Sequence, residues 1–117
     1  MPIVVDVDFR PFEPGVLGRS DGVRIWPDST SNTWYPIALA NKLAGRDLAP
    51  NSSDITVNFS SNVTNWYFGT DGSVAYAAGK YDFVSVVLHE IGHALGCVGL
   101  MSNVNGQGKW ESGGPAA

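Results

Sequence analysis

The sequence is poor in cysteine, in positive charge and in long apolar runs, and each shortage excludes a class of protein. The single Cys97 rules out a disulfide framework and a multi-cysteine zinc site, and we expect it to be a small buried residue. Seven Lys and Arg against eleven Asp and Glu are scattered from Arg10 to Lys109, so a nucleic-acid surface has no electrostatic support. No apolar run approaches the roughly 18 residues that a membrane span needs, and residues 1–8 lack the features of a signal peptide. We expect no nucleic-acid or membrane partner.

The length of 117 residues and the hydrophobic content of 44% fit one small domain with a modest core. We therefore expect residues 1–117 to form a single domain, and a monomer. Glycines and a proline crowd residues 101–117, which predicts a loop. The domain is expected to be truncated at its carboxy-terminal end.

Periodicity and turn residues predict the elements that precede residue 82. Alternating apolar residues predict strands at 3–9 and at 54–60, the second with one wet face. Residues 11–20 are expected to be a loop. Pro36 and Gly45 are suited to the start and the end of a helix at 36–44, which would back the sheet. Short strands are also expected at 23–26, 66–69 and 74–77, the last two joined by a turn at Asp71-Gly72.

The segment 82–95 predicts a helix, because of its length, an Asp82 suited to be the N-cap and a terminating Gly96. Apolar residues cover most of its surface, so we expect it to be buried nearly all round. At 3.6 residues per turn, a single polar seam remains, made of Asp82, Ser85, His89, His93 and Gly96.

The seam holds both histidines of the chain, His89 and His93. Four residues apart on a helix, their side chains lie about 6 Å apart on one face and can converge on one ion, most often zinc. Glu90 is rotated away from the ligand direction but can reach a zinc-activated water as general base. The spacing therefore predicts a hydrolytic zinc site with His89 and His93 as metal ligands and Glu90 as the catalytic residue.

The segment His89-Glu90-Ile91-Gly92-His93-Ala94-Leu95-Gly96 resembles the active-site helix of zincin metallopeptidases, and Gly96 matches the glycine of the metzincin pattern. More loosely, residues 34–43, 66–72 and 81–85 resemble the amino-terminal half of secreted bacterial zincin-like proteins. The resemblance implies an α+β fold, with a small twisted mixed sheet, a backing helix and an active-site helix. It also implies a secreted Zn²⁺-dependent metalloendopeptidase that hydrolyses peptide or protein substrates, with further ligands supplied by a carboxy-terminal half.

The third zinc ligand stays open. Gly99 occupies the position of the third metzincin ligand and has no side chain. Asp82 is about 10 Å from His89 along the axis, and Cys97 follows His93 on the same helix, where three ligands cannot close a tetrahedron. Glu111, eighteen residues after His93, is a candidate. Met101 is expected to be a plain apolar residue.

The oxyanion donor is also open, and the candidates are Tyr67, Tyr76 and Tyr81. Two alternatives to a peptidase remain: a non-catalytic metal-binding remnant of a zincin, and a structural domain without metal.

Overall fold

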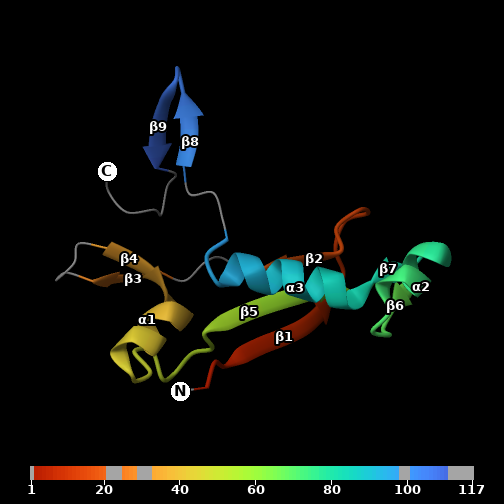
Figure 1. The fold of residues 1–117 in the computed structure, drawn as a ribbon, viewed down its shortest axis with the longest axis horizontal. Helices are drawn as coiled ribbons and strands as arrows, with labels where there is room; N and C mark the ends of the chain where they lie inside the picture. Colours follow the sequence, from red (N-terminus) through yellow and green to blue (C-terminus); the bar gives the residue numbers. More distant parts are fainter. Residues whose placement is uncertain (1, 21–24, 29–32, 98–100, 111–117) are drawn as a thin grey trace.

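A mixed three-stranded sheet and one long helix form the centre of the protein (Figure 1). The structure is a computed structural model that describes residues 2–20, 25–28, 33–97 and 101–110. The fold class is α+β, as predicted. The elements are β1 (Val5–Arg10), β2 (Gly18–Ser20), β3 (Ile25–Asp28), β4 (Thr33–Pro36), α1 (Ile37–Ala44), β5 (Ile55–Ser60), β6 (Trp66–Tyr67), α2 (Gly72–Ala77), β7 (Tyr81–Asp82), α3 (Phe83–Ala94), β8 (Met101–Val104) and β9 (Gln107–Trp110).

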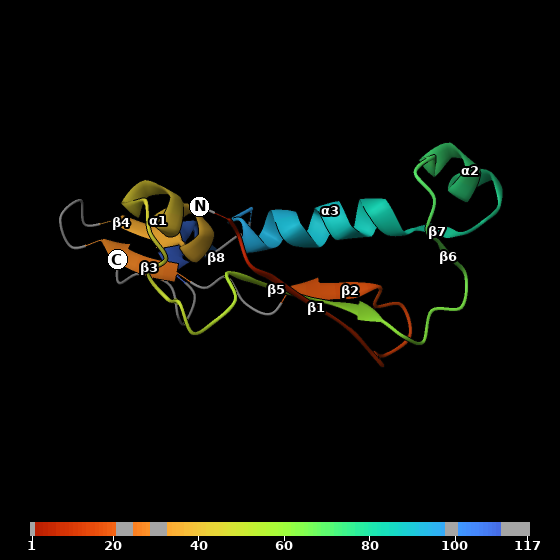
Figure 2. The same cartoon turned by 90° about the horizontal axis from the view of Figure 1, so that it is seen from below.

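The sheet has the order β1-β5-β2. β1 runs parallel to β5, with Val5 opposite Ile55 and Arg10 opposite Ser60, whereas β2 runs antiparallel to β5. α3 covers one face of this sheet and contacts β2 and β5 (Figure 2). Figure 1 shows the start of β1 beside the strip that α3 covers, whereas the end of β1 meets the start of α3, where Phe9 stacks on Phe83. The strands predicted at 3–9 and 54–60 are thus confirmed as β1 and β5.

The core lies between β5 and α3. Ile55, Val57 and Phe59 project from β5 and pack with Ala94 of α3. Phe83 begins α3 and joins the aromatic rings of several elements, with ring centroids 4.8 Å from Phe59 and 5.8 Å from Phe9. These contacts stabilise the packing of α3 on the sheet, because large aromatic rings bury much apolar area.

α1 lies at the amino end of β5, beside the β3–β4 hairpin. The helix predicted at 36–44 is therefore confirmed, and Gly45 ends it with a φ of 67°. The buried Asn41 amide donates to Asp54 at 2.6 Å, and the second Asp54 oxygen accepts the N–H of Val4 at 2.8 Å. This network ties α1 to both parallel strands.

Five expectations about secondary structure are corrected. β2 lies within 11–20, where only a loop was expected, and the strand expected at 23–26 occupies 25–28 within the described residues. Residues 74–77 belong to helix α2 and not to a strand, while β6 is shorter than expected and covers 66–67. The hairpin β8–β9 occupies 101–110 of the stretch that was expected to be a loop, and 111–117 lie outside the described residues.

The helix α2 forms in place of the expected strand for a local reason. The Asp71 carboxylate accepts hydrogen bonds from both the hydroxyl and the N–H of Ser73, so it acts as an N-cap. The same bonds hold the pKa of Asp71 below its ordinary value.

Two expectations about burial are also wrong. β5 is buried on both faces, since Asn58 and Ser60 are as inaccessible as its apolar residues. α3, in contrast, is half open: Leu88 is 66% exposed, and Val84 and Leu95 are exposed too. A sheet packs against one side of a helix only, and α3 has its main strand contacts with β2 and β5 of this one sheet. Within the described ranges, no helix combines the length and the apolar character needed to cross a membrane.

Candidate metal centre

The candidate metal centre is built on the carboxy-terminal half of α3. Asp82 caps the helix, with one carboxylate oxygen accepting from the N–H of Ser85 at 3.2 Å and from its hydroxyl at 2.5 Å. The predicted N-cap role of Asp82 is thereby confirmed. The helix ends at Ala94, and Gly96 follows with a φ of 110°. The two histidines therefore lie in the last two turns of a helix that is capped at its start.

The predicted convergence of the two imidazoles is present. The Nε2 atoms of His89 and His93 are 2.9 Å apart, and the rings meet edge to face with centroids separated by 4.4 Å. His89 is exposed and His93 is partly buried, so the Nε2 pair is close to solvent. An ion can reach this pair from outside the protein.

A backbone carbonyl fixes the tautomer of His93. Its Nδ1 lies 2.8 Å from the carbonyl oxygen of Cys97. A carbonyl can only accept, so Nδ1 carries the proton and donates it. In the neutral ring, Nε2 is then left with its lone pair facing His89. This is the outer-shell hydrogen bond that metal-binding histidines usually make, and it orients the ring for an ion.

The spacing of the two Nε2 atoms fits a shared metal ion. Zn–N bonds of about 2.0–2.1 Å at a tetrahedral angle place two ligand nitrogens about 3.3 Å apart. The observed 2.9 Å corresponds to an angle of roughly 90° at the same bond length. A shift of a few tenths of an ångström therefore converts the pair into a tetrahedral arrangement. Without metal, the N–H of His89 Nε2 donates to His93 Nε2, and an ion would replace that proton.

Glu90 points inward, whereas the histidine pair lies close to solvent. It is 8% exposed and lies beneath β2, where its Cγ would be 3.4 Å from a Cβ placed on Gly18. Within the described part of the chain, its carboxylate makes no hydrogen bond or ion pair. Its oxygens are not among the fully buried polar atoms, so the carboxylate keeps contact with solvent through the cleft that it lines.

A cleft of about 550 Å³ opens beside the pair. His89 and Glu90 line it together with Ser85 and Val86 of α3, and its opposite wall is the segment 15–18 that leads into β2. Apart from Glu90, the lining carries no charged side chain. The arrangement is a mostly neutral groove with one carboxylate and one imidazole at its floor.

No third protein ligand joins the two imidazoles among the described residues, where no group of three His, Cys, Asp or Glu side chains could hold an ion. Cys97 is exposed, which corrects the expectation that it is buried. Gly99 and Glu111 lie outside the described residues, as does the side chain of Met101. Asp82 caps the start of α3 through Oδ2, and its Oδ1 is buried without a hydrogen-bond partner about two helical turns from His89. The third ligand therefore stays open.

None of the tyrosines proposed as oxyanion donors lines the cleft. Tyr67 and Tyr81 lie in the paired strands β6 and β7, and Tyr76 is 90% exposed on α2. These elements flank the start of α3, away from the histidines at its end (Figure 1).

Sequence reasoning missed two parts of the site. The bond from His93 to the Cys97 carbonyl has no sign in the helical pattern, because Cys97 lies beyond the end of α3. The wall formed by residues 15–18 carries no recognisable pattern, and only the tertiary fold brings it to α3.

No protein-family model, curated protein or solved structure matches this chain. The chemistry of the site is therefore inferred from its own residues.

Proposed function

We propose that the protein is a zinc-dependent metallopeptidase in which His89 and His93 hold the metal and Glu90 is the general base. The observation that carries this proposal is the approach of the two Nε2 atoms to 2.9 Å, with His93 oriented by the Cys97 carbonyl. The similarity of residues 89–96 to the active-site helix of zincins supports the same interpretation.

Each residue has a separate task in this proposal. Zinc held by the two imidazoles would polarise the scissile carbonyl and lower the pKa of a water molecule. The Glu90 carboxylate accepts the proton of the attacking water and delivers it to the leaving amine. The Cys97 carbonyl keeps His93 in the tautomer whose Nε2 is free to bind. Glu111 remains the sequence candidate for the third ligand.

The position of Glu90 favours catalysis over a purely structural metal site. A structural site needs only its ligands, and a carboxylate that faces a cleft beside them without a protein partner among the described residues does not help to hold the metal. In a hydrolytic site, the same carboxylate must stay free to accept a proton. The cleft also gives an extended chain room to lie beside it.

The test measures zinc content and peptide hydrolysis on the same preparations. Protein purified without chelator should contain zinc and cleave a mixed library of fluorogenic peptides. Glu90→Gln should retain zinc and lose at least about 10²-fold in rate, the usual contribution of a general base. His93→Ala should lose both zinc and hydrolysis, because one imidazole alone binds weakly.

Glu13→Gln is the matched control, since it changes an exposed carboxylate that pairs with Arg19. It should retain zinc and activity. Turnover that persists in Glu90→Gln would refute the general-base role. Zinc binding without hydrolysis of any library member would favour the non-catalytic remnant, and protein that never binds zinc would favour the structural domain.

A further inference from the structure

β1 is an edge strand whose apolar side chains α3 covers only in part: Phe9 packs against Phe83 at the start of α3, yet it stays exposed, as do Val5 and Val7. Val5, Val7 and Phe9 share a face with Ile55, Val57 and Phe59 of β5, because these residues are paired in register. The β5 residues are buried, whereas the β1 residues are all exposed, Val7 at 55%. A period-two apolar strand at a sheet edge is a surface that favours pairing with another strand.

The outer edge of β1 presents backbone groups of the same residues. The carbonyls of Val4 and Arg10 accept bonds from residues 54, 55 and 61 on the β5 side. Successive residues alternate in direction, so Val5, Val7 and Phe9 turn their N–H and C=O groups outward. Among the described residues, no strand pairs with this edge.

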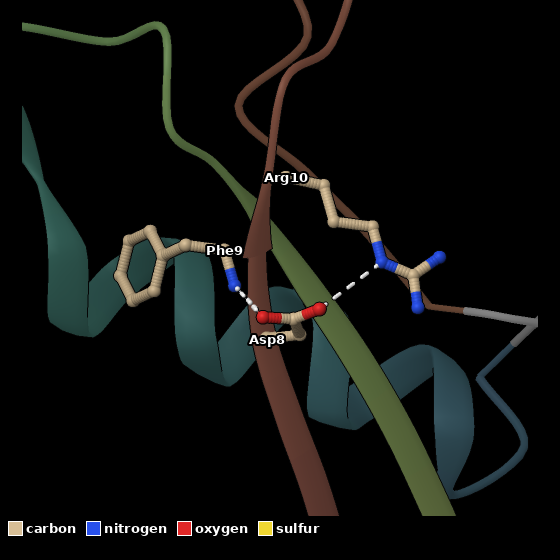
Figure 3. A network of polar contacts seen from close by, with 3 residues as sticks. All are labelled: Asp8, Phe9 and Arg10. Carbon is tan, nitrogen blue, oxygen red and sulfur yellow. Dashed lines mark hydrogen bonds and ion pairs between the residues drawn. The ribbon is translucent and has the colours of Figure 1, made fainter.

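Asp8 partly blocks that edge. Its carboxylate accepts the outward N–H of Phe9 at 2.8 Å and pairs with Arg10 at 3.4 Å (Figure 3). Figure 3 also shows the Phe9 ring and the Arg10 side chain extending to opposite sides of the strand. The charged residues thus lie on one face of β1 and the apolar residues on the other.

The flank of α3 above β1 is apolar as well. Val84, Leu88 and Leu95 are exposed, and helical geometry puts them on the side of α3 opposite to Glu90. Since Glu90 faces β2, this flank lies on the β1 side of the helix. The apolar edge is therefore continuous with an apolar helix flank and is separate from the metal centre.

We propose that a second copy of this chain pairs with β1, antiparallel and about a twofold axis at Asp8. In this register Val7 lies opposite the partner's Phe9, and both pairs of outward backbone groups can form hydrogen bonds. Asp6 then lies opposite the partner's Arg10, twice, which gives two cross-strand pairs of opposite charge. Registers centred on Val7 or on Asp6 instead set carboxylates opposite each other without any such pair. A register centred on Phe9 also pairs opposite charges, but it joins only residues 8–10 of β1 and so forms fewer backbone hydrogen bonds.

Charge complementarity is what selects a second copy as the occupant. Asp6 is not part of the Asp8–Arg10 ion pair, and in the proposed register it lies opposite Arg10 of the second copy. Asp8 meets its own symmetry mate at the axis, and the repulsion between them limits the affinity. The proposed dimer is therefore weak, and it differs from the monomer expected from the sequence.

Sedimentation equilibrium of the whole chain from micromolar to millimolar concentration tests the dimer. The wild-type mass should rise toward twice the monomer mass, and Asp8→Asn should shift this rise to at least tenfold lower concentration. Asp6→Arg alone and Arg10→Asp alone should each remain monomeric, since each sets like charges opposite each other. An equimolar mixture of the two should dimerise, because each cross-strand pair then joins an arginine of one variant with an aspartate of the other.

Lys80→Asp is the control, since it makes the same charge change as Arg10→Asp on an exposed residue away from β1. It should leave the rise in mass unchanged, and circular dichroism checks that each variant folds. A wild-type mass that stays monomeric at every concentration overturns the proposal, whether or not the variants fold. A mixture of charge variants that stays monomeric while wild type dimerises overturns the register and the β1 interface.

Discussion

Two glycines near the histidines, Gly92 and Gly96, differ in whether the structure leaves room for a side chain. Gly92 lies inside α3, and a Cβ added to it would find no atom within 4 Å. Gly96 has a φ of 110°, and its Cβ would be 2.7 Å from Cγ of Pro36. The first glycine is therefore replaceable, while the second joins the helix end to β4.

We predict opposite stability changes for Gly92→Ala and Gly96→Ala. Gly92→Ala should raise the free energy of unfolding by about 0.5–1 kcal/mol, because alanine loses less backbone entropy in a helix. Gly96→Ala should lower it by about 1 kcal/mol or more, because the conformation is strained for alanine and Pro36 must move. Urea unfolding followed by circular dichroism measures both. A Gly92→Ala protein less stable than wild type would show that α3 is not helical at this position.

At the residue scale, the sequence could predict that His89 and His93 lie together with Glu90 beside them, because the relation of these residues is local. A four-residue spacing on a helix brings two rings together whatever surrounds the helix, and the 2.9 Å approach follows from it. The cleft wall at residues 15–18 could not be predicted, since it depends on how β2 pairs with β5. The exposure of Cys97 depended in the same way on the tertiary fold.

The stability of α3 depends on its amino-terminal cap, and a single substitution at Asp82 tests this contribution. Asp82→Ala removes the acceptor for the N–H and the hydroxyl of Ser85, and it should lower the free energy of unfolding by about 1 kcal/mol. Asp82→Ser should recover most of the loss, because serine is also a good N-cap. Thermal unfolding of the three proteins gives the comparison. Equal losses for alanine and serine would point to a role of the carboxylate other than capping.

At the element scale, prediction succeeded where length, caps and periodicity agreed, as in α1, α3 and β5. The prediction of a strand failed for 74–77, because Asp71-Gly72 was interpreted as a turn, whereas Asp71 is the N-cap of α2 and bonds to Ser73. Prediction also failed for the β8–β9 hairpin, although Asn105-Gly106 is a strong turn signal; both residues have positive φ, 54° and 81°. The burial of α3 is less than expected because apolar composition does not reveal whether a second layer covers the side of the helix that faces away from the sheet.

At the scale of the whole molecule, one small core connects elements that otherwise lie apart. α1 with the β3–β4 hairpin flanks one end of α3, and α2 with β6 and β7 flanks the other (Figures 1 and 2). Between them, the packing of β5 against α3 centres on Phe59 and its neighbours. Loss of packing there should therefore affect the metal centre as well as stability.

We predict that Phe59→Leu lowers the free energy of unfolding by about 1–2 kcal/mol, whereas Phe68→Leu changes it by less than about 0.5 kcal/mol. Phe59 is 2% exposed and contacts the rings of Phe9 and Phe83. Phe68 also contacts Phe83, at 5.0 Å between ring centroids, but it is 65% exposed and so loses little burial. A smaller side chain at 59 leaves a gap under α3, and surrounding atoms relax only partly. Denaturant unfolding with and without zinc measures both variants. Equal losses at the two positions would mean that the β5–α3 interface is not the centre of the fold.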